Sequence, residues 1–229
     1  MIYGLATVLP RMFSFILVPL YTDLLPKAEY GQITVIFAYM IFFNVILAYG
    51  METSFFRFYN KEDDKKKVIE TSMVTIFWTT ILFLAGALTF RNDIAKFIEI
   101  DVQYVTYSIW ILVLDALVII PFSKLRAIQR PSFYAFLKIS NVVVNLSLNV
   151  FFLVYLPKIV ASQPSGFLSS IYFENFQIGY VFISNVIASL LTFVLLSKDY
   201  FTLNWKFDVQ LWKQMMKYGM PILVSGVAF

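Results

Sequence analysis

The sequence contains no cysteine and no histidine. Disulfides, thiolate or imidazole metal ligands, thiol nucleophiles and imidazole bases are therefore excluded. It also lacks a glycine-rich loop followed by lysine, the pattern that binds nucleotide phosphates, so ATP is not expected to act on this chain directly. We expect no cofactor, no metal site and no enzymatic activity.

Charge is scarce as well. Charged residues make up 14% of the 229 residues, hydrophobic residues 60% and aromatic residues 19%, and the mean hydropathy is +0.76. These values lie outside the range of soluble domains and indicate a membrane protein with several spans. The formal net charge of +4 is explained below by loop composition, and no nucleic-acid partner is expected.

Six apolar segments near spanning length can be identified, since a helix crosses the hydrocarbon core with about 20 residues. The first is too long for a signal peptide, has no basic residues before it and no small-residue cleavage site after it. The sequence therefore predicts an all-α, polytopic membrane protein. The predicted spans are about 3–22, 31–51, 68–90, 104–123, 134–156 and 176–197, with a seventh from 218 onward.

The cations are distributed unevenly between the connectors. Those after the second, fourth and sixth segments hold twelve of the 18 Lys and Arg residues, and the other three connectors hold four. Because cytoplasmic loops carry an excess of Lys and Arg, this bias predicts that the N-terminus and the even-numbered connectors are cytoplasmic.

The first segment carries Arg11 near its middle, between Pro10 and Pro19. A guanidinium at that depth costs at least about 2.5–3.5 kcal/mol, so it should face protein or a water-filled cavity. Two interpretations remain open. Arg11 lines a cavity, or it pairs with Asp115, which lies at a matching depth in the fourth segment and would then act as a protonation switch.

The fifth segment has a polar stripe formed by Lys138, Asn141, Asn145 and Asn149. Spacings of three, four and four place all four side chains on one helix face. The stripe is either a cavity wall or a set of hydrogen bonds between helices, which average about 0.6 kcal/mol each. Weaker stripes are expected to serve helix packing: Ser72, Thr75 and Thr79 on the third segment, and Asn185, Ser189 and Thr192 on the sixth.

Arg57 belongs to a basic connector after the second segment. It is expected either to bind anionic lipid headgroups with its lysine neighbours or to act as a gate or ligand contact. Membrane lipids are therefore expected partners.

The predicted domains are a six-helix lobe over 1–197, a linker with a short amphipathic helix over 198–217, and the start of a seventh transmembrane helix over 218–229. Tyr218-Gly219 echoes Tyr3-Gly4, so we expect a second repeat to begin here and to continue past Phe229, with a further amphipathic segment before Tyr3.

Pro-Leu-Tyr-Thr at 19–22, followed by Glu-Tyr-Gly at 29–31 and by Gly50 with Phe-Arg-Phe-Tyr at 56–59, resembles the Wzx-type oligosaccharide flippases. These belong to the multidrug/oligosaccharidyl-lipid/polysaccharide exporter superfamily. The resemblance implies two six-helix lobes around a central cavity in the bacterial cytoplasmic membrane. It also implies transport of undecaprenyl-pyrophosphate-linked oligosaccharide, as in O-antigen lipopolysaccharide assembly, with other polysaccharide-assembly membrane proteins as partners.

Under that reading the substrate-binding candidates are Arg11, Arg57, Asp115, Lys138 and the asparagine row of the fifth segment. Two alternatives are a cation-coupled multidrug exporter and a non-transporting membrane protein or glycan polymerase. Buried cations favour an anionic cargo over organic cations. The 157–175 connector, with just Lys158 and Glu174 as charged residues, disfavours a polymerase.

Overall fold

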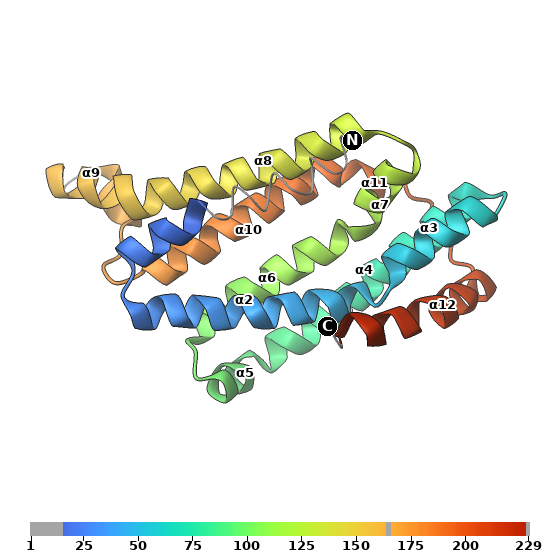
Figure 1. Cartoon of the computed structure of the whole chain (residues 1–229), viewed down its shortest axis with the longest axis horizontal. Coiled ribbons are helices and arrows are strands. Elements are labelled where there is room, and N and C mark those ends of the chain that lie inside the picture. The colour runs from blue at the N-terminus through green and yellow to red at the C-terminus, as the bar shows by residue number, and fades with distance from the viewer. Residues whose placement is uncertain (1–15, 164–165, 228–229) are drawn as a thin grey trace.

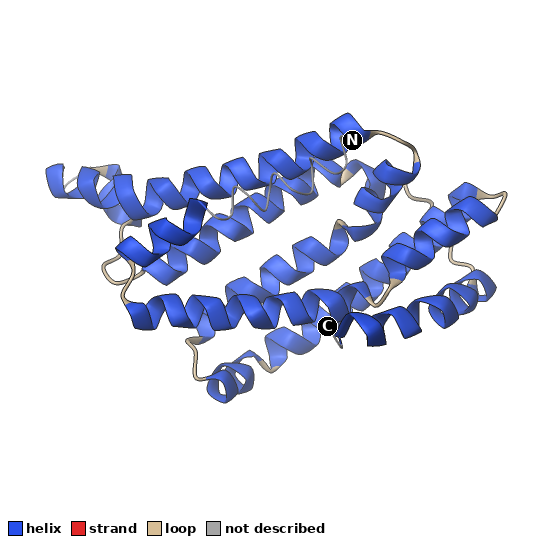
Figure 2. Cartoon of the chain, viewed as in Figure 1, coloured by secondary structure: helices blue, strands red, loops and turns tan. Residues whose placement is uncertain are grey.

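The computed structural model describes residues 16–163 and 166–227. Within these ranges the chain is helical and has no strand (Figures 1 and 2). Five helical stretches of the described residues are long and apolar enough to cross a membrane. The all-α, polytopic fold class is therefore confirmed. The helices are α2 (Lys27–Ala48), α3 (Met51–Lys61), α4 (Lys65–Thr89), α5 (Arg91–Ile98), α6 (Val102–Leu117), α7 (Ile119–Ala127), α8 (Pro131–Val150), α9 (Leu156–Ser162), α10 (Gln177–Leu196), α11 (Lys198–Phe201) and α12 (Val209–Val227).

Five of the six predicted spans correspond to these stretches, some of which consist of two helices in succession. The first predicted span lies mostly outside the described residues, and its end is helical over 16–24. The connector predicted over 157–175 contains α9 and a 3₁₀ turn at Phe167–Ile171.

Aspartates begin three of the helices. A carboxylate at this position accepts a hydrogen bond from an otherwise unpaired backbone N–H of the first turn. Asp64 caps α4, Asp101 caps α6 and Asp208 caps α12; the donors are the N–H groups of Lys67, Gln103 and Leu211, at 3.1, 2.7 and 2.7 Å.

A break separates α6 from α7 because Pro121 has no N–H to donate to the carbonyl of Leu117. An unpaired carbonyl inside the hydrocarbon region costs several kcal/mol in principle. The buried Tyr200 hydroxyl, from α11, donates to this carbonyl at 2.7 Å. A side chain at the end of the sixth span therefore supplies the hydrogen bond that is missing at the break in the fourth span.

A second bend joins α2 to α3, where Tyr49 and Gly50 both have positive φ, 30° and 71°. α12 approaches the bend closely: a Cβ on Gly50 would lie 2.2 Å from the carbonyl oxygen of Gly219. The Ser54 hydroxyl also donates to the carbonyl of Met215, at 2.9 Å. Glycine is required at position 50 both for its backbone conformation and for this contact.

α12 is one helix from Val209 to Val227. The amphipathic segment expected to end at Lys217 and the span expected to begin at Tyr218 are therefore continuous. Leu211 and Met215 are buried against the bundle, which shows that this helix packs on protein along its first two turns.

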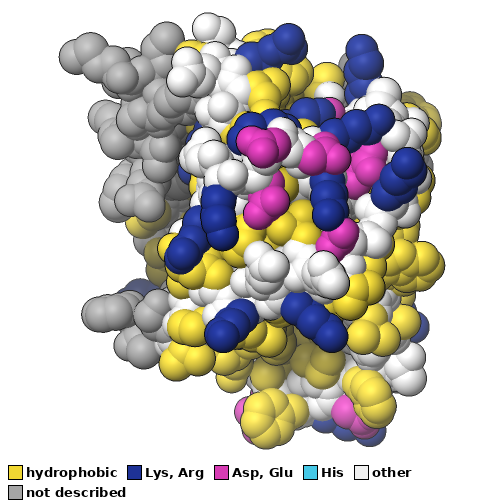
Figure 3. Space-filling model, turned by 90° about the vertical axis from the view of Figure 1, so that its right-hand side faces the viewer, with side chains coloured by type: hydrophobic (Ala, Val, Ile, Leu, Met, Phe, Trp, Pro, Cys, Tyr) yellow, Lys and Arg dark blue, Asp and Glu magenta, His cyan; other side chains and the backbone are white. Residues whose placement is uncertain are grey.

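The even-numbered connectors lie together at one end of the bundle, the right-hand end in Figure 1, which we call the charged end. Figure 3 views this end and shows basic and acidic side chains interspersed over it. Ion pairs join its helices: Lys67 to Asp208 and Lys124 to Asp199, both at 2.7 Å. The Leu211 N–H and the Lys67 ammonium hold the pKa of Asp208 below its ordinary value, so the α12 cap stays ionised at neutral pH.

Candidate functional site

A cavity of about 940 Å³ lies inside the bundle, bordered by the helical segment 16–24 and by α2, α3, α6, α7, α8 and α10. We call it the polar cavity because amide, hydroxyl and charged side chains line it among apolar ones. Its charged lining residues within the described ranges are Glu52, Asp115, Arg126 and Lys138.

The asparagine row of α8 forms part of the cavity wall and also binds α10. Asn141 donates to the Thr192 hydroxyl at 3.0 Å, and Asn145 donates to the Asn185 carbonyl oxygen at 2.8 Å. All four residues line the cavity. Asn141 and Asn145 therefore combine the two roles that the sequence left as alternatives, helix pairing and cavity lining.

Asn149, the last residue of the row, is fully buried and does not line the polar cavity. Its amide donates to the side-chain oxygen of Asn145 at 2.6 Å and to the backbone carbonyl of the same residue at 2.9 Å. The Tyr21 hydroxyl donates to Asn149 at 2.9 Å. This hydrogen bond anchors the segment 16–24 to α8. The sequence did not predict it, because a tyrosine near a helix end usually marks the membrane interface.

Asp115, on α6, accepts a hydrogen bond from the Ser189 hydroxyl of α10 at 2.8 Å. Lys138 lies 4.3 Å from the centre of the Phe122 ring, a distance typical of a cation–π contact. Arg11 lies outside the described residues. Its cavity role and its pairing with Asp115 therefore stay predictions.

An ion pair between Glu52 of α3 and Arg126 of α7 borders the polar cavity toward the charged end. The guanidinium carbon also lies 4.8 Å from the ring centre of Phe56 and 5.8 Å from that of Tyr134. The sequence predicted no role in the cavity for either residue. Their depth could have suggested the pair, because both residues lie toward the charged end of their spans, the second and the fourth.

Arg57 is exposed on α3 and does not border the polar cavity. Its guanidinium carbon lies 4.1 Å from the centre of the Tyr218 ring on α12. In the described structure Arg57 therefore joins α3 to α12.

The hydroxyls of the third span mostly bond within their own helix. Ser72 donates to the Val68 carbonyl at 2.7 Å and Thr75 to the Thr71 carbonyl at 2.6 Å. Such bonds add no polar surface to a cavity. No group of three or more acidic side chains in the described part of the chain lies close enough together to hold a metal ion.

A second hollow, of about 600 Å³, lies among α2, α4, α5 and α6. We call it the apolar groove, because its lining side chains are aliphatic or aromatic apart from Asp93, Ser108 and the hydroxyl of Tyr39. The Ser108 hydroxyl is bonded to the Tyr104 carbonyl at 2.8 Å. This surface suits hydrocarbon.

Comparison with curated proteins and with solved structures finds no match. A family model described as "Polysaccharide biosynthesis protein" matches residues 1–229, the whole of the chain. Together with the five apolar helical stretches, this match makes the chain a multi-pass membrane protein. It belongs to the polysaccharide biosynthesis protein family.

Proposed function

We propose that the protein moves an undecaprenyl-pyrophosphate-linked oligosaccharide from the cytoplasmic to the outer leaflet of the bacterial cytoplasmic membrane, without changing it chemically. Family membership supports a role in polysaccharide biosynthesis. The polar cavity inside an apolar helix bundle is the observation that carries the proposal.

The lining chemistry suits such a cargo. Asparagine side chains both donate and accept hydrogen bonds, as sugar hydroxyls require, and Asn141 and Asn145 present theirs to the cavity. The Lys138 ammonium offers a positive charge for a phosphate. A cavity of about 940 Å³ is at the upper end of the size of small-molecule sites, so it has room for a phosphate group and adjoining sugars while the prenyl tail stays in lipid.

The position of Lys138 also argues for function over packing. An intramembrane cation costs at least about 2.5–3.5 kcal/mol at the bilayer centre and usually marks a substrate or ion pathway. Among the described residues Lys138 has no ion-pair partner within 4.0 Å. Its ammonium lies over the Phe122 ring and borders the cavity, where it is available to an anionic ligand.

Orientation follows the positive-inside rule. With the charged end in the cytoplasm, the Glu52–Arg126 pair stands at the cytoplasmic side of the cavity. Cargo would enter past this pair and leave on the other side when two lobes rock around the site in an alternating-access cycle.

Export of organic cations is the competing function, and it would use the cavity carboxylates. Both carboxylates already have partners, since Glu52 pairs with Arg126 and Asp115 accepts from Ser189. Among the described residues neither Asp115 nor Lys138 forms an ion pair within 4.0 Å. The Asp115 carboxylate is engaged by the Ser189 hydroxyl, so we assign the cargo contact to the Lys138 ammonium and favour an anionic cargo.

The proposal can be tested in proteoliposomes that contain the purified protein and a fluorescent undecaprenyl-pyrophosphate oligosaccharide. Flipping is measured as the fraction of sugar that becomes accessible to a membrane-impermeant lectin. We expect Lys138→Met to lower the initial rate about tenfold or more, the value of one charge-assisted contact.

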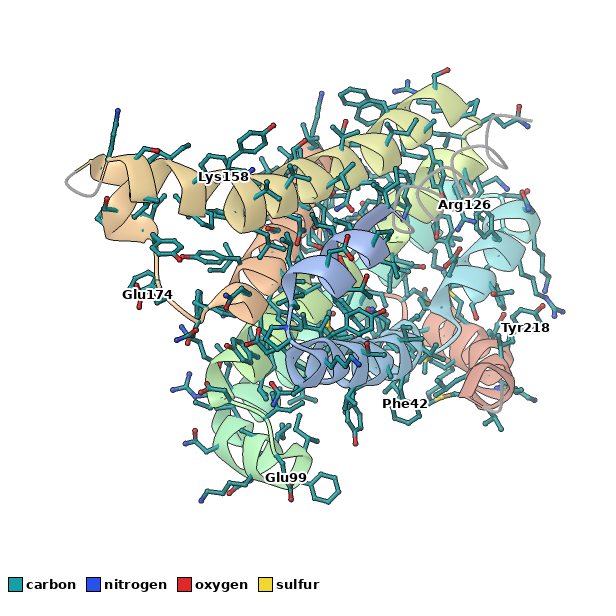
Figure 4. All side chains as sticks on the ribbon, turned by 60° about the vertical axis from the view of Figure 1, so that its left-hand side comes forward. Phe42, Glu99, Arg126, Lys158, Glu174 and Tyr218 are labelled. Atoms are coloured by element: carbon teal, nitrogen blue, oxygen red, sulfur yellow. The ribbon has the colours of Figure 1, made fainter. Side chains whose placement is uncertain are left out.

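Lys158→Met is the matched control, because Lys158 is exposed on α9 and lies outside the polar cavity (Figure 4). Its rate should equal that of the wild type. Equal rates for wild type and Lys138→Met, or export of organic cations in place of flipping, would refute the proposal.

A further inference from the structure

Two cations of the polar cavity flank one aromatic pair. The rings of Phe122 and Tyr134 meet edge to face, with their centres 5.4 Å apart. The Arg126 guanidinium lies 5.8 Å from the Tyr134 ring centre, and the Lys138 ammonium lies 4.3 Å from the Phe122 ring centre. All four residues border the same cavity, so the two cations lie on one wall, around one aromatic pair.

The guanidinium of Arg126 is incompletely satisfied. One terminal nitrogen donates to Glu52, and the buried Nε has no hydrogen-bond partner among the residues that the structure describes. Buried N–H groups without an acceptor are uncommon, and each one calls for an explanation such as a missing ligand. An arginine side chain can offer two parallel N–H donors to a phosphate. The Nε of Arg126 has almost no exposed surface while the guanidinium is paired with Glu52, so it would become such a donor when the guanidinium leaves Glu52. Figure 4 places Arg126 between α7 and α3.

We propose that Arg126 and Lys138 form a two-cation site for a diphosphate group, one cation for each phosphate, and that Glu52 is the resident counterion which the diphosphate displaces from Arg126. This inference rests on the proposed function and names the part of the cargo that the cavity holds near the charged end. It concerns Arg126 and Glu52, to which the sequence assigned no role in binding.

The counterion explains how the site can exist when it is empty. A bare guanidinium in a partly buried position is unfavourable, and a carboxylate partner offsets part of that penalty. The side chains of Arg126 and Glu52 are 30% and 44% exposed. The ion pair can therefore separate while both charged groups stay partly in contact with solvent.

Charge and geometry give the site its selectivity. A diphosphate carries more negative charge and more acceptor oxygens than one carboxylate, so it can replace Glu52 and reach Lys138 at the same time. We expect a monophosphate, which has a single phosphate group, to neutralise one of the two cations. Glu52 therefore lowers the affinity for the diphosphate and returns to Arg126 when the cargo leaves.

The test uses the purified protein in detergent and two soluble probes, farnesyl diphosphate and farnesyl monophosphate, with affinities from isothermal titration calorimetry. We expect Arg126→Gln to weaken binding of the diphosphate about tenfold and to remove its advantage over the monophosphate. Glu52→Gln should strengthen diphosphate binding about fivefold, because no counterion has to be displaced.

Lys124→Gln is the matched control. Lys124 lies on the same helix, two residues from Arg126, and forms an ion pair of the same kind with Asp199 at 2.7 Å, away from the polar cavity. Its variant should bind both probes like the wild type. Melting temperatures of all variants are recorded in parallel, and the gain of affinity in Glu52→Gln cannot result from misfolding.

Equal effects of Arg126→Gln and Lys124→Gln, or weaker binding in Glu52→Gln, would overturn the two-cation site. So would wild-type protein that binds both probes equally. These results leave the proposed function standing if the Lys138-dependent flipping in proteoliposomes is observed. Failure of that flipping assay counts against the proposed function itself.

Discussion

The polar cavity and the apolar groove are formed in part by the same two helices, α2 and α6, yet they have opposite chemistry. Ile111 borders the polar cavity and its neighbour Leu112 borders the apolar groove. Successive residues of a helix project about 100° apart, so one turn of α6 presents side chains to both. Composition of a span therefore says less about its role than the face on which each polar residue lies.

The difference also separates what each hollow can accept. The polar cavity offers hydrogen-bonding partners and charge, so water or a polar ligand can occupy it. The apolar groove offers almost none, and an acyl chain can fill it without leaving a polar group unpaired.

A lysine placed on either side of α6 should reveal this contrast most strongly. Leu112→Lys puts an ammonium against the apolar groove and should cost at least about 2.5–3.5 kcal/mol. Ile111→Lys puts the same group against the polar cavity, one turn before Asp115, and should cost considerably less because a carboxylate lies within reach. The parent residues Ile111 and Leu112 are almost fully buried, 2% and 4% exposed respectively, so the comparison is matched. Melting temperature and the yield of monodisperse protein in detergent provide the measurement.

Similar losses in the two variants would show that the two sides of α6 have equivalent environments, contrary to the contrast. A larger loss of stability in Ile111→Lys than in Leu112→Lys would contradict the assignment of the polar and apolar sides of α6.

Asn145→Leu should have the next largest effect. It removes the bond to Asn185 and one of the two bonds from Asn149, and we expect a loss of about 1–2 kcal/mol of stability from interhelical contacts and unpaired amides. Ser108→Ala, in the apolar groove, should change stability by less than about 0.5 kcal/mol, since its hydroxyl only bonds its own helix. Urea unfolding in mixed micelles would measure both, and a larger loss for Ser108→Ala would contradict the expectation.

The smallest predicted effect is a gain. Gly86 borders the apolar groove from inside α4, and a Cβ added there meets nothing within 4 Å. Gly86→Ala should raise stability by about 0.5–1 kcal/mol through helix propensity. Gly31→Ala, equally open but outside both hollows, is the control. If Gly86→Ala raises stability more than Gly31→Ala, the difference measures the contribution of filling the groove. A loss of stability in Gly86→Ala would contradict the open space beside Gly86.

The sequence predicted the spans well because each is a long apolar run bounded by charge or proline. It placed Lys138, Asn141 and Asn145 on one face because helical spacing is independent of tertiary structure, and the structure adds that this face meets α10 and a cavity. Periodicity could not reveal the Glu52–Arg126 pair. Those residues lie in different spans, and their contact depends on the bends at Gly50 and Pro121, whose angles no local pattern specifies.

The anchoring of the segment 16–24 was missed for a related reason. Tyr21 lies near a predicted helix end, where tyrosine usually indicates the membrane interface. Its partner Asn149 is 128 residues away, and only the packing of α8 beside that segment makes the bond. The extent of α12 was missed because its lysines suggested a surface helix, whereas Leu211 and Met215 dock it on the bundle.

The hydroxyl of Tyr200 at the kink in the fourth span has a mechanical consequence. That kink orients α7, which carries Phe122 and Arg126, while Tyr200 stands at the start of the connector that leads to α12. A rotation of the connector that moves the Tyr200 hydroxyl away removes its hydrogen bond to the Leu117 carbonyl. The orientation of α7, and with it the positions of Phe122 and Arg126, is therefore coupled to movement of α12. Tyr200→Phe would remove this hydrogen bond and uncouple α7 from α12, while the phenyl ring would keep the packing at the kink.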